Sequence, residues 1–279
     1  MQGLQGRVAL VTGASRGIGK GIAQVLGAAG ATVYVTGRTE DAASATVPLA
    51  GTIHETAALI NDAGGTCVAL RCDHRDDGQV REVFDQIIAK QKRLDILVNN
   101  AWSGYQAKQS GRKSGFKTPF WRLPPDFWDT MHTVGVRSTY VASVFGAAQM
   151  VEQQSGLIIQ ISVDARVPSD NVAYGTAKSS VNRMAAEMAP GLSQHGVTVL
   201  SLCPFIVATE MIMANKKSQD LASWLESPQF VGRVVVALAT DPEVRRWTGN
   251  MLSTRQLALD YNLTDIDGHV PTLPPAPKN

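Results

Sequence analysis

Short apolar runs alternate along the chain with longer stretches in which apolar residues return every three or four positions. The runs predict buried β-strands, and the stretches predict amphipathic helices. The expected strands cover residues 8–12, 32–36, 67–71, 96–99, 157–162, 197–202 and 250–253. The expected helices cover residues 17–29, 52–63, 77–91, 125–153, 172–194 and 228–240.

Strands that are apolar along their whole length and separated by helices are typical of a parallel sheet covered on both faces. The predicted fold is therefore α/β, a doubly wound Rossmann-type parallel sheet with helices on both faces, forming a single domain over residues 1–262. Residues 263–279 form a Pro-rich C-terminal tail, whose end should be extended and weakly ordered. With 279 residues and 44% apolar content, the chain can bury one such core.

The first strand runs into a glycine-rich loop, T-G-A-S-R-G-I-G between Thr12 and Gly19, and apolar residues at helical spacing follow it. Strand, glycine turn and helix in this order build a dinucleotide site, with the phosphate at the helix N-terminus. Gly13 would permit the tight turn, Gly17 the approach of the pyrophosphate, and Gly19 the packing of the helix on the strand. The spacing differs from the commoner G-x-G-x-x-G, so the position after the first strand is what favours nucleotide binding.

Tyr174 and Lys178 stand four residues apart in Y-G-T-A-K, on the same side of the helix expected over residues 172–194. An ammonium close to a phenol favours the phenolate and lowers the pKa of the tyrosine, which can then act as a general acid or base. Alone, such a pair is also common on a solvated helix surface. The other motifs of the chain favour the catalytic interpretation.

Four motifs occur in order: the glycine loop, Asn99-Asn100-Ala101, a strand that ends at Ser162, and Tyr174-x-x-x-Lys178. Together they resemble the short-chain dehydrogenase/reductase family, over about residues 5–255. The segment 120–140 and D-I-D-G at 265–268 resemble the branch of this family called SDR family member one. The resemblance implies an enzyme that transfers hydride between a nicotinamide and a carbonyl or secondary alcohol of a small molecule.

The resemblance also implies which residues contact the cofactor. Asp73 matches the family's adenine contact, and Thr209 matches the threonine that contacts the nicotinamide amide. His74, beside Asp73, is interpreted as a polar loop residue. The expected cofactor-binding residues are Gly13, Ser15, Arg16, Gly17, Ile18, Gly19, Arg38, Asp73, Asn100, Ala101, Tyr174, Lys178, Pro204, Val207 and Thr209.

The end of the second strand, Gly37-Arg38, indicates which nucleotide is used. An acidic residue there would hold the ribose hydroxyls of NAD, whereas a basic one accommodates the 2′-phosphate of NADP. Arg16 lies inside the glycine loop, where relatives that use NADP often carry a cation. The two guanidinium groups favour NADP(H) by their charge complementarity to phosphate. An NAD-dependent secondary-alcohol dehydrogenase is the alternative enzyme.

By the same resemblance, the catalytic residues are Ser162, Tyr174 and Lys178. Tyr174 would give a proton to the carbonyl oxygen, and Lys178 would lower its pKa and hold the nicotinamide ribose. Ser162 would donate a hydrogen bond to the oxygen on which negative charge develops. The family's strand commonly ends Ser-Ser with the second serine catalytic, whereas Val163 follows Ser162 here. Ser169 is therefore the other candidate.

Three further positions depart from the family pattern. Gly135 stands where many relatives have an asparagine that completes a proton-relay tetrad, and His132 is only a weak substitute. Trp102 and Phe205 stand where the family usually has glycine. These departures favour a second class of function, a catalytically idle NADP-binding regulatory protein.

Two segments should border the substrate, residues 102–124 and 206–227. The first interleaves basic and aromatic residues, which fits either a lid for an anionic or aromatic carbonyl compound or a solvated basic loop. The second lies where relatives place a mobile substrate lid, although core packing explains some of its apolar residues equally well. The first set is Tyr105, Lys108, Arg112, Lys113, Phe116, Lys117, Phe120 and Trp121, and the second is Met211, Ile212, Met213 and Trp224.

Charge and cysteine content narrow the partners and the compartment. A net charge of +2 argues against a general nucleic-acid surface. Cys67, Cys72 and Cys203 lack metal-ligand spacing, so we expect no metal and three buried thiols in a reducing compartment. No run of apolar residues is long enough for a membrane span, and the N-terminus lacks a signal-type core. These features predict a soluble cytoplasmic protein.

The resemblance implies a homodimer or homotetramer. The expected contact surface lies on the helices over residues 125–153 and 172–194. Small residues such as Ala142, Ser143 and Ala147 are expected on their outer faces.

Overall fold

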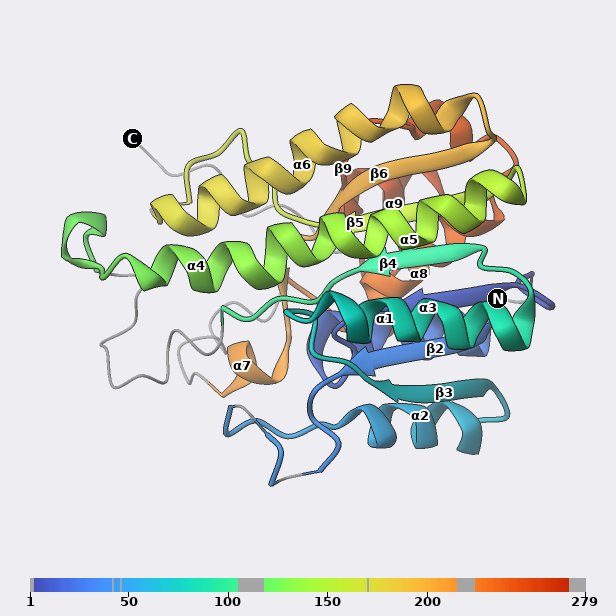
Figure 1. Ribbon diagram of the computed structural model, residues 1–279, viewed down its shortest axis with the longest axis horizontal. Helices are drawn as coiled ribbons and strands as arrows, with labels where there is room; N and C mark the ends of the chain where they lie inside the picture. Colours follow the sequence, from blue (N-terminus) through green and yellow to red (C-terminus); the bar gives the residue numbers. More distant parts are fainter. Residues whose placement is uncertain are drawn as a thin grey trace.

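The computed structural model describes residues 3–41, 43–45, 47–104, 118–169, 171–214 and 224–270. Its main element is a seven-stranded sheet of order β3-β2-β1-β4-β5-β6-β9, in which all neighbours are parallel (Figure 1). The strands are β1 (Val8–Val11), β2 (Thr32–Gly37), β3 (Thr66–Arg71), β4 (Ile96–Asn99), β5 (Gly156–Ile161), β6 (Val197–Cys203) and β9 (Met251–Ser253). A separate pair, β7 (Ile206–Val207) and β8 (Leu225–Glu226), is also parallel.

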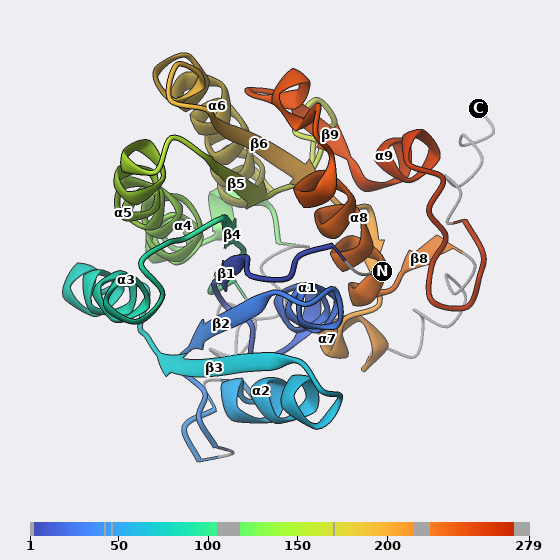
Figure 2. The ribbon, with the colours of Figure 1, turned by 90° about the vertical axis from the view of Figure 1, so that its right-hand side faces the viewer.

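Helices cover both faces of the sheet, as the view along the strands in Figure 2 shows. On one face α1 (Gly17–Ala28), α2 (Ile53–Asp62), α8 (Pro228–Thr240) and α9 (Thr254–Asp260) share a single apolar core with the strands. On the other face α3 (Asp77–Gln91), α5 (Ser138–Glu152) and α6 (Val172–Ser193) share a second core. The predicted doubly wound α/β fold is confirmed.

The strand order reverses between β1 and β4, and this point positions the functional site. The chain leaves β1 toward β2 and β3 on one side, and returns to β4, β5 and β6 on the other. At such a switch point the loops that follow the two strands separate, which opens a crevice at the carboxyl ends of the strands. The residues singled out from the sequence follow these same strands.

The helix expected over residues 125–153 is interrupted, so this prediction was wrong as one continuous element. The chain forms α4 (Asp126–His132), a π-helical segment over Thr133–Arg137, and then α5. Val134 and Gly135 have non-helical backbone angles inside that segment. Ser138 and Thr139 hold the break, because Gly135 N–H donates to Ser138 Oγ at 3.1 Å and Thr139 Oγ1 donates to Gly135 O at 2.9 Å. Apolar periodicity continues through the break, which hides it in the sequence.

The small residues Ala142 and Ser143 face the sheet, so their expected place on the outer face of the helix was wrong. Both are 1% exposed, and Ser143 Oγ accepts a hydrogen bond from Asn99 Nδ2 at 2.9 Å. The outer face of α5 instead presents the larger side chains of Tyr140 and Val144. Small residues here allow a close approach of α5 to β4.

Several short elements were not predicted. They are a 3₁₀ turn at Phe120–Arg122, α7 (Glu210–Met213), a second 3₁₀ turn at Val244–Trp247, and α9. Each has seven residues or fewer, so none spans enough turns to show a helical period. Among the described residues, every helix is too short or too polar to cross a bilayer.

Residues 263–270 fold back on the domain. Asp265 is buried and accepts hydrogen bonds from Ser227 N–H at 2.8 Å and from the Ser227 hydroxyl. Arg233 on α8 donates to the backbone oxygens of Thr264 and Asp265. The tail from Pro271 onward lies outside the described residues.

Candidate functional site

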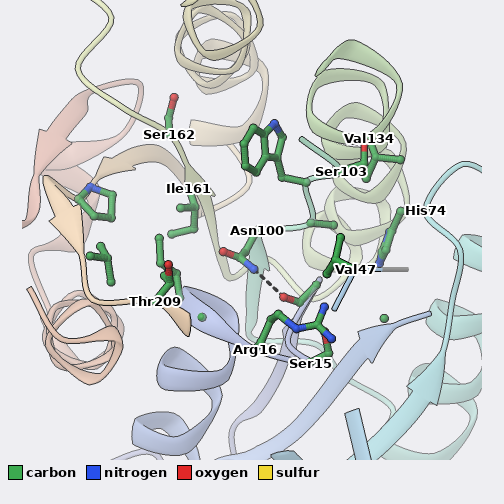
Figure 3. Close-up of a pocket in the computed structure, with 18 of the residues that line it drawn as sticks. Ser15, Arg16, Val47, His74, Asn100, Ser103, Val134, Ile161, Ser162 and Thr209 are labelled. Atoms are coloured by element: carbon green, nitrogen blue, oxygen red, sulfur yellow. Dashed lines mark hydrogen bonds between the residues drawn. The ribbon is translucent and has the colours of Figure 1, made fainter. Parts of the chain in front are cut away.

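A cavity of about 330 Å³ opens at the carboxyl ends of β1, β4, β5 and β6 (Figure 3). The residues predicted for catalysis and cofactor binding line it, with one exception. That exception is Gly19, which lies beneath the cavity, where an added Cβ would be 2.5 Å from Asn100 Nδ2. Residues far apart in the sequence are thus brought to one place by the parallel strand ends.

The glycine loop and the end of β4 are joined by hydrogen bonds. Asn100 Nδ2 donates to the carbonyls of Thr12 at 3.0 Å and Gly13 at 2.9 Å, and Thr12 Oγ1 accepts from the N–H groups of Asn100 and Ala101. Gly13 has φ +66°, and a Cβ there would lie 2.7 Å from Ala101 Cα. The loop therefore requires glycine for both its conformation and its packing.

The N-terminus of α1 already carries an anion. Gly17 N–H donates to Glu210 Oε2 at 2.8 Å, so the first residue of α7 places its carboxylate on the first residue of α1. Gly17 has φ +57°, which a glycine adopts without strain. Backbone N–H groups and the helix dipole favour negative charge at this position, so the same place suits a phosphate.

Two arginines line the cavity near the glycine loop, Arg16 within the loop and Arg38 directly after β2. Arg16 donates to the carbonyls of Leu49, Ala50 and Gly51 at 2.8 to 3.2 Å and so holds the loop after β2 against the glycine loop. Arg38 lies 3.9 Å from Asp73, and its side chain is 20% exposed. Both guanidinium groups line the cavity. They bring two positive charges to this part of the cavity, where Asp73 contributes one negative charge.

Asp73 is held in place by the arginines around it. Arg75 forms a bidentate pair with its carboxylate, in which Nε donates to Oδ1 at 3.1 Å and a terminal guanidinium nitrogen donates to Oδ2 at 2.5 Å. Burial opposes the charged carboxylate, but the hydrogen bonds from Arg75 and the charge of Arg38 outweigh it and lower the pKa of Asp73. The carboxylate is therefore fixed at the cavity wall.

His74 lies in the turn after β3, as a loop residue should, but it is buried. It is 7% exposed, and its Nε2 lies 2.8 Å from Thr36 Oγ1. Burial lowers the pKa of His74 to about 4, which keeps the imidazole neutral. Within the described residues its Nδ1 has no hydrogen-bond partner. Sequence reasoning missed this because a histidine after a strand carries no signal of its burial.

Tyr174 and Lys178 come together on the first two turns of α6. Asn171 caps the helix, since Tyr174 N–H donates to Asn171 Oδ1 at 2.9 Å, and a cap residue just before the helix is a signal the sequence does contain. Lys178 Nζ donates to Ile161 O at 2.9 Å, which fixes the ammonium at the end of β5. Burial lowers the pKa of Lys178 to about 8.

Ser162 lies at the cavity wall, but its hydroxyl points elsewhere. Its Oγ donates to the backbone oxygen of Lys178 at 3.2 Å, and in Figure 3 it is directed away from Asn100. Ser169 donates to Asn171 O at 3.0 Å and does not line the cavity. Of the two serines, Ser162 can therefore face the cavity after a side-chain rotation alone, whereas Ser169 cannot.

A buried ion pair supports the part of the cavity lined by Pro204 and Phe205. Glu226 is 0% exposed and accepts hydrogen bonds from Arg255 Nε at 3.0 Å, Thr254 Oγ1 at 2.9 Å and Phe205 N–H at 3.2 Å. The Arg255 guanidinium lies 4.4 Å from the centre of the Phe205 ring. These contacts fix the backbone after Pro204, where the family pattern has glycine in place of Phe205. The sequence pattern does not indicate that Glu226 and Arg255 form an ion pair, because they are far apart in the chain.

The predictions on the substrate-side segments, the cysteines and the absence of a metal can be compared with the structure only where their residues are described. Residues 105–117 and 215–223, which include most of the expected basic and aromatic lid, lie outside the described residues. Cys67, Cys72 and Cys203 are buried and free, and burial raises the pKa of each thiol to about 12. Among the described side chains, no three His, Cys, Asp or Glu groups gather as a metal site would require.

Comparison with known proteins places this site in context. A family model described as short chain dehydrogenase matches residues 7–220. Dehydrogenase/reductase SDR family member 1 of Mus musculus is 42% identical over 279 residues, covering 95% of this chain and 85% of the mouse protein. The protein of the same name from Homo sapiens is 39% identical over the same shares of the two chains.

Solved structures agree in fold. A metagenomic short-chain oxidoreductase in complex with NADP superposes with a TM-score of 0.70 at 29% identity, over 90% of this chain and 96% of that chain. A 7 alpha-hydroxysteroid dehydrogenase complexed with NADH and 7-oxo glycochenodeoxycholic acid has a TM-score of 0.74 over 90% of this chain and 93% of that chain. At 24% identity, this second likeness shows the fold alone.

Proposed function

Because the chain belongs to the short-chain dehydrogenase family, a family of nicotinamide-dependent oxidoreductases that act on small molecules, we propose that its own cofactor is NADP(H) and its substrate a carbonyl compound or secondary alcohol. One observation carries the proposal: a single cavity is lined by Tyr174 and Lys178, which lie on α6, and by Arg38, which follows β2. The first pair serves proton transfer and the last serves the 2′-phosphate.

The described residues fit a dinucleotide. The Glu210 carboxylate on Gly17 N–H stands in for a phosphate at the N-terminus of α1. The buried Nδ1 of His74 offers a hydrogen-bonding group near the end of β3. Gly13 leaves room for close approach beside Ala101. Arg16 and Arg38 would hold the 2′-phosphate, and Thr209 would hold the nicotinamide amide.

When bound, the nicotinamide supplies the hydride. Tyr174 donates its phenolic proton to the carbonyl oxygen, and accepts it back in alcohol oxidation. The Lys178 ammonium lowers the pKa of that phenol and also holds the ribose. Ser162, after rotating away from Lys178 O, donates a hydrogen bond to the same oxygen.

The substrate side of the cavity is mostly apolar, which favours carbonyl compounds with apolar substituents. The described residues there share hydrophobic side chains, and one of them, Trp102, contacts the Tyr174 ring. They are Trp102, Val134, Val163, Phe205 and Ile212.

A catalytically idle NADP-binding protein is the second candidate, and the hydroxyl of Ser162 favours it, because that group donates to Lys178 O. An assay separates the two candidates. We would follow NADPH and NADH oxidation over a panel of aldehydes, ketones and quinones. Turnover with NADPH that disappears in Tyr174→Phe supports the enzyme, whereas tight NADPH binding without turnover of any compound supports the idle protein.

We further propose a cytoplasmic homodimer or homotetramer. Tyr140 and Val144 on α5 and Val172 on α6 are each more than a third exposed, which provides apolar contact area on these helices. The three buried free thiols fit a reducing compartment. Light scattering after size exclusion should give a mass of two or four chains, and a monomer at micromolar concentration would contradict the proposal.

Ser162→Ala should lower turnover by about 10²-fold, because the alanine cannot donate to the developing oxyanion. Ser169→Ala is the matched control and should change turnover by less than about threefold, because its hydroxyl lies outside the cavity lining. Steady-state rates at saturating NADPH measure both. A larger loss in Ser169→Ala than in Ser162→Ala would show that the loop residue is the donor.

The rate of carbonyl reduction should fall as the pH rises above about 8, where buried Lys178 loses its proton. The pKa of this lysine is lowered from its usual value, so the ammonium that supports Tyr174 is present below that pH and lost above it. At low substrate concentration we expect kcat/KM to fall about tenfold per pH unit there. Cys67→Ser is the control and should keep the same profile, since burial raises the pKa of that thiol to about 12 and it lies outside the cavity lining. A flat profile to pH 10, with an intact fold by circular dichroism, would contradict the assignment.

A further inference from the structure

Trp102 lies directly against the proposed proton donor. Its indole meets the Tyr174 ring edge to face, with ring centres 5.7 Å apart and an interplanar angle of 66°. Both rings pack on a small buried cluster formed by α4 and α6, made of Phe127, Met131, Ala173 and Ala177. The phenol therefore has an aromatic wall beside it.

Two glycines border the indole, one near each end of the ring system. A Cβ on Gly135 would lie 3.1 Å from Trp102 Cδ1 and 3.8 Å from Nε1. A Cβ on Gly104 would lie 1.9 Å from Trp102 Cζ2. Any side chain at position 135 would therefore press on the five-membered ring, and one at position 104 on the six-membered ring. The space that the indole fills, called its slot below, therefore exists because positions 104 and 135 carry no side chain.

The loop that carries Trp102 is fastened to the same break in the helix that carries Gly135. Ser103 N–H donates to Val134 O at 3.1 Å, and Ser103 Oγ donates to Thr130 O at 2.7 Å. The labelled side chains of Ser103 and Val134 lie together in Figure 3. The indole, its slot and the helix break thus form one unit.

From this geometry, we propose that Trp102 is a positioning residue for Tyr174, and that position 135 is glycine because the indole needs the space. Two departures from the family pattern, the tryptophan after Ala101 and the missing asparagine at 135, then have one cause. The indole restricts the phenol to the orientation that faces the cavity, which is the kind of positioning on which turnover depends strongly. It also keeps water away from one face of the phenol. This inference rests on the proposed role of Tyr174.

The first test measures the phenol itself and needs no substrate. Absorbance at alkaline pH reports phenolate formation, and the part missing in Tyr174→Phe belongs to Tyr174. Trp102→Gly and Gly135→Ala should both lower its midpoint by about half a pH unit or more, because water then reaches the phenolate. Trp102→Phe, which keeps an aromatic wall, should leave the midpoint nearly unchanged. Equal midpoints in the wild type and in all three variants at positions 102 and 135 would overturn the proposal, whether or not any substrate is turned over.

The second test asks whether the two positions act through each other. Gly135→Ala should lower kcat by about tenfold or more in the wild type, yet by less than about threefold in the Trp102→Gly background. NADPH affinity should change little, since Arg16 and Arg38, which would hold the 2′-phosphate, are untouched. Gly191→Ala on α6 is the matched control, because a Cβ there meets no atom within 4 Å. Additive losses would overturn the proposal, and if Trp102→Gly does not fold, Trp102→Leu takes its place in the cycle.

Discussion

Replacing Tyr174 by phenylalanine should abolish carbonyl reduction while leaving NADPH binding within a few-fold. The substitution removes one hydroxyl and keeps the ring, so the edge-to-face contact with Trp102 and the packing of α6 survive. Loss of a positioned general acid typically lowers turnover by about 10² to 10⁴-fold. Stopped-flow or steady-state NADPH oxidation measures the rate, and fluorescence titration measures the affinity.

Tyr140→Phe is the matched control for this variant. It removes the same hydroxyl from an exposed position on α5, outside the cavity lining, and should leave turnover unchanged. If Tyr174→Phe keeps more than a tenth of the wild-type rate, Tyr174 is not the proton donor. The oxidoreductase assignment of the family would then require another acid in the same cavity.

Replacing Arg38 by aspartate should invert the preference between NADPH and NADH. The 2′-phosphate would meet a carboxylate in place of a guanidinium, whereas the ribose hydroxyls of NADH could donate to that carboxylate. A charge-assisted hydrogen bond is worth about 1.5 to 3 kcal/mol, so each lost contact should weaken NADPH binding by about 10- to 150-fold. Dissociation constants for both nucleotides, measured at fixed ionic strength because salt screens the charges, give the ratio.

Lys90→Asp controls for the change in net charge. Lys90 is exposed in the last turn of α3, at the opposite edge of the sheet from the cavity, and should alter both affinities alike. Arg16 remains in the Arg38→Asp variant, so some phosphate affinity should persist. Wild-type protein that binds NADH as tightly as NADPH would contradict the cofactor assignment, whatever the variant does.

The sequence predicted the sheet closely because parallel strands buried on both faces are apolar along their length. All seven strands of the sheet lie within about a residue of their expected bounds, and the motifs that end them gather at one edge, as parallel topology requires. The family expected from those motifs is confirmed. Local pattern and global fold agree wherever burial decides both.

Prediction failed where tertiary contacts decide the outcome. The break at Gly135 depends on hydrogen bonds to Ser138 and Thr139 and on an indole from another loop, and none of these changes the apolar period. His74 is buried, and its ring contacts Thr36 near the end of β2. The residues that flank Glu226 and Arg255 in the sequence do not indicate that these two form an ion pair. Each depends on contacts that only the folded chain creates.

The carboxylate of Glu210 makes the protein its own competitor for the anion position on α1. A phosphate that takes the place of this carboxylate must displace a group tethered to the same chain, so its measured affinity is the intrinsic affinity reduced to the fraction of molecules in which the carboxylate has left. Thermodynamic reciprocity gives the converse: a bound phosphate weakens the hold on α7 by the same factor. Phosphate binding at Gly17 N–H and release of Glu210 from it would therefore be coupled, and the release can be followed without any substrate.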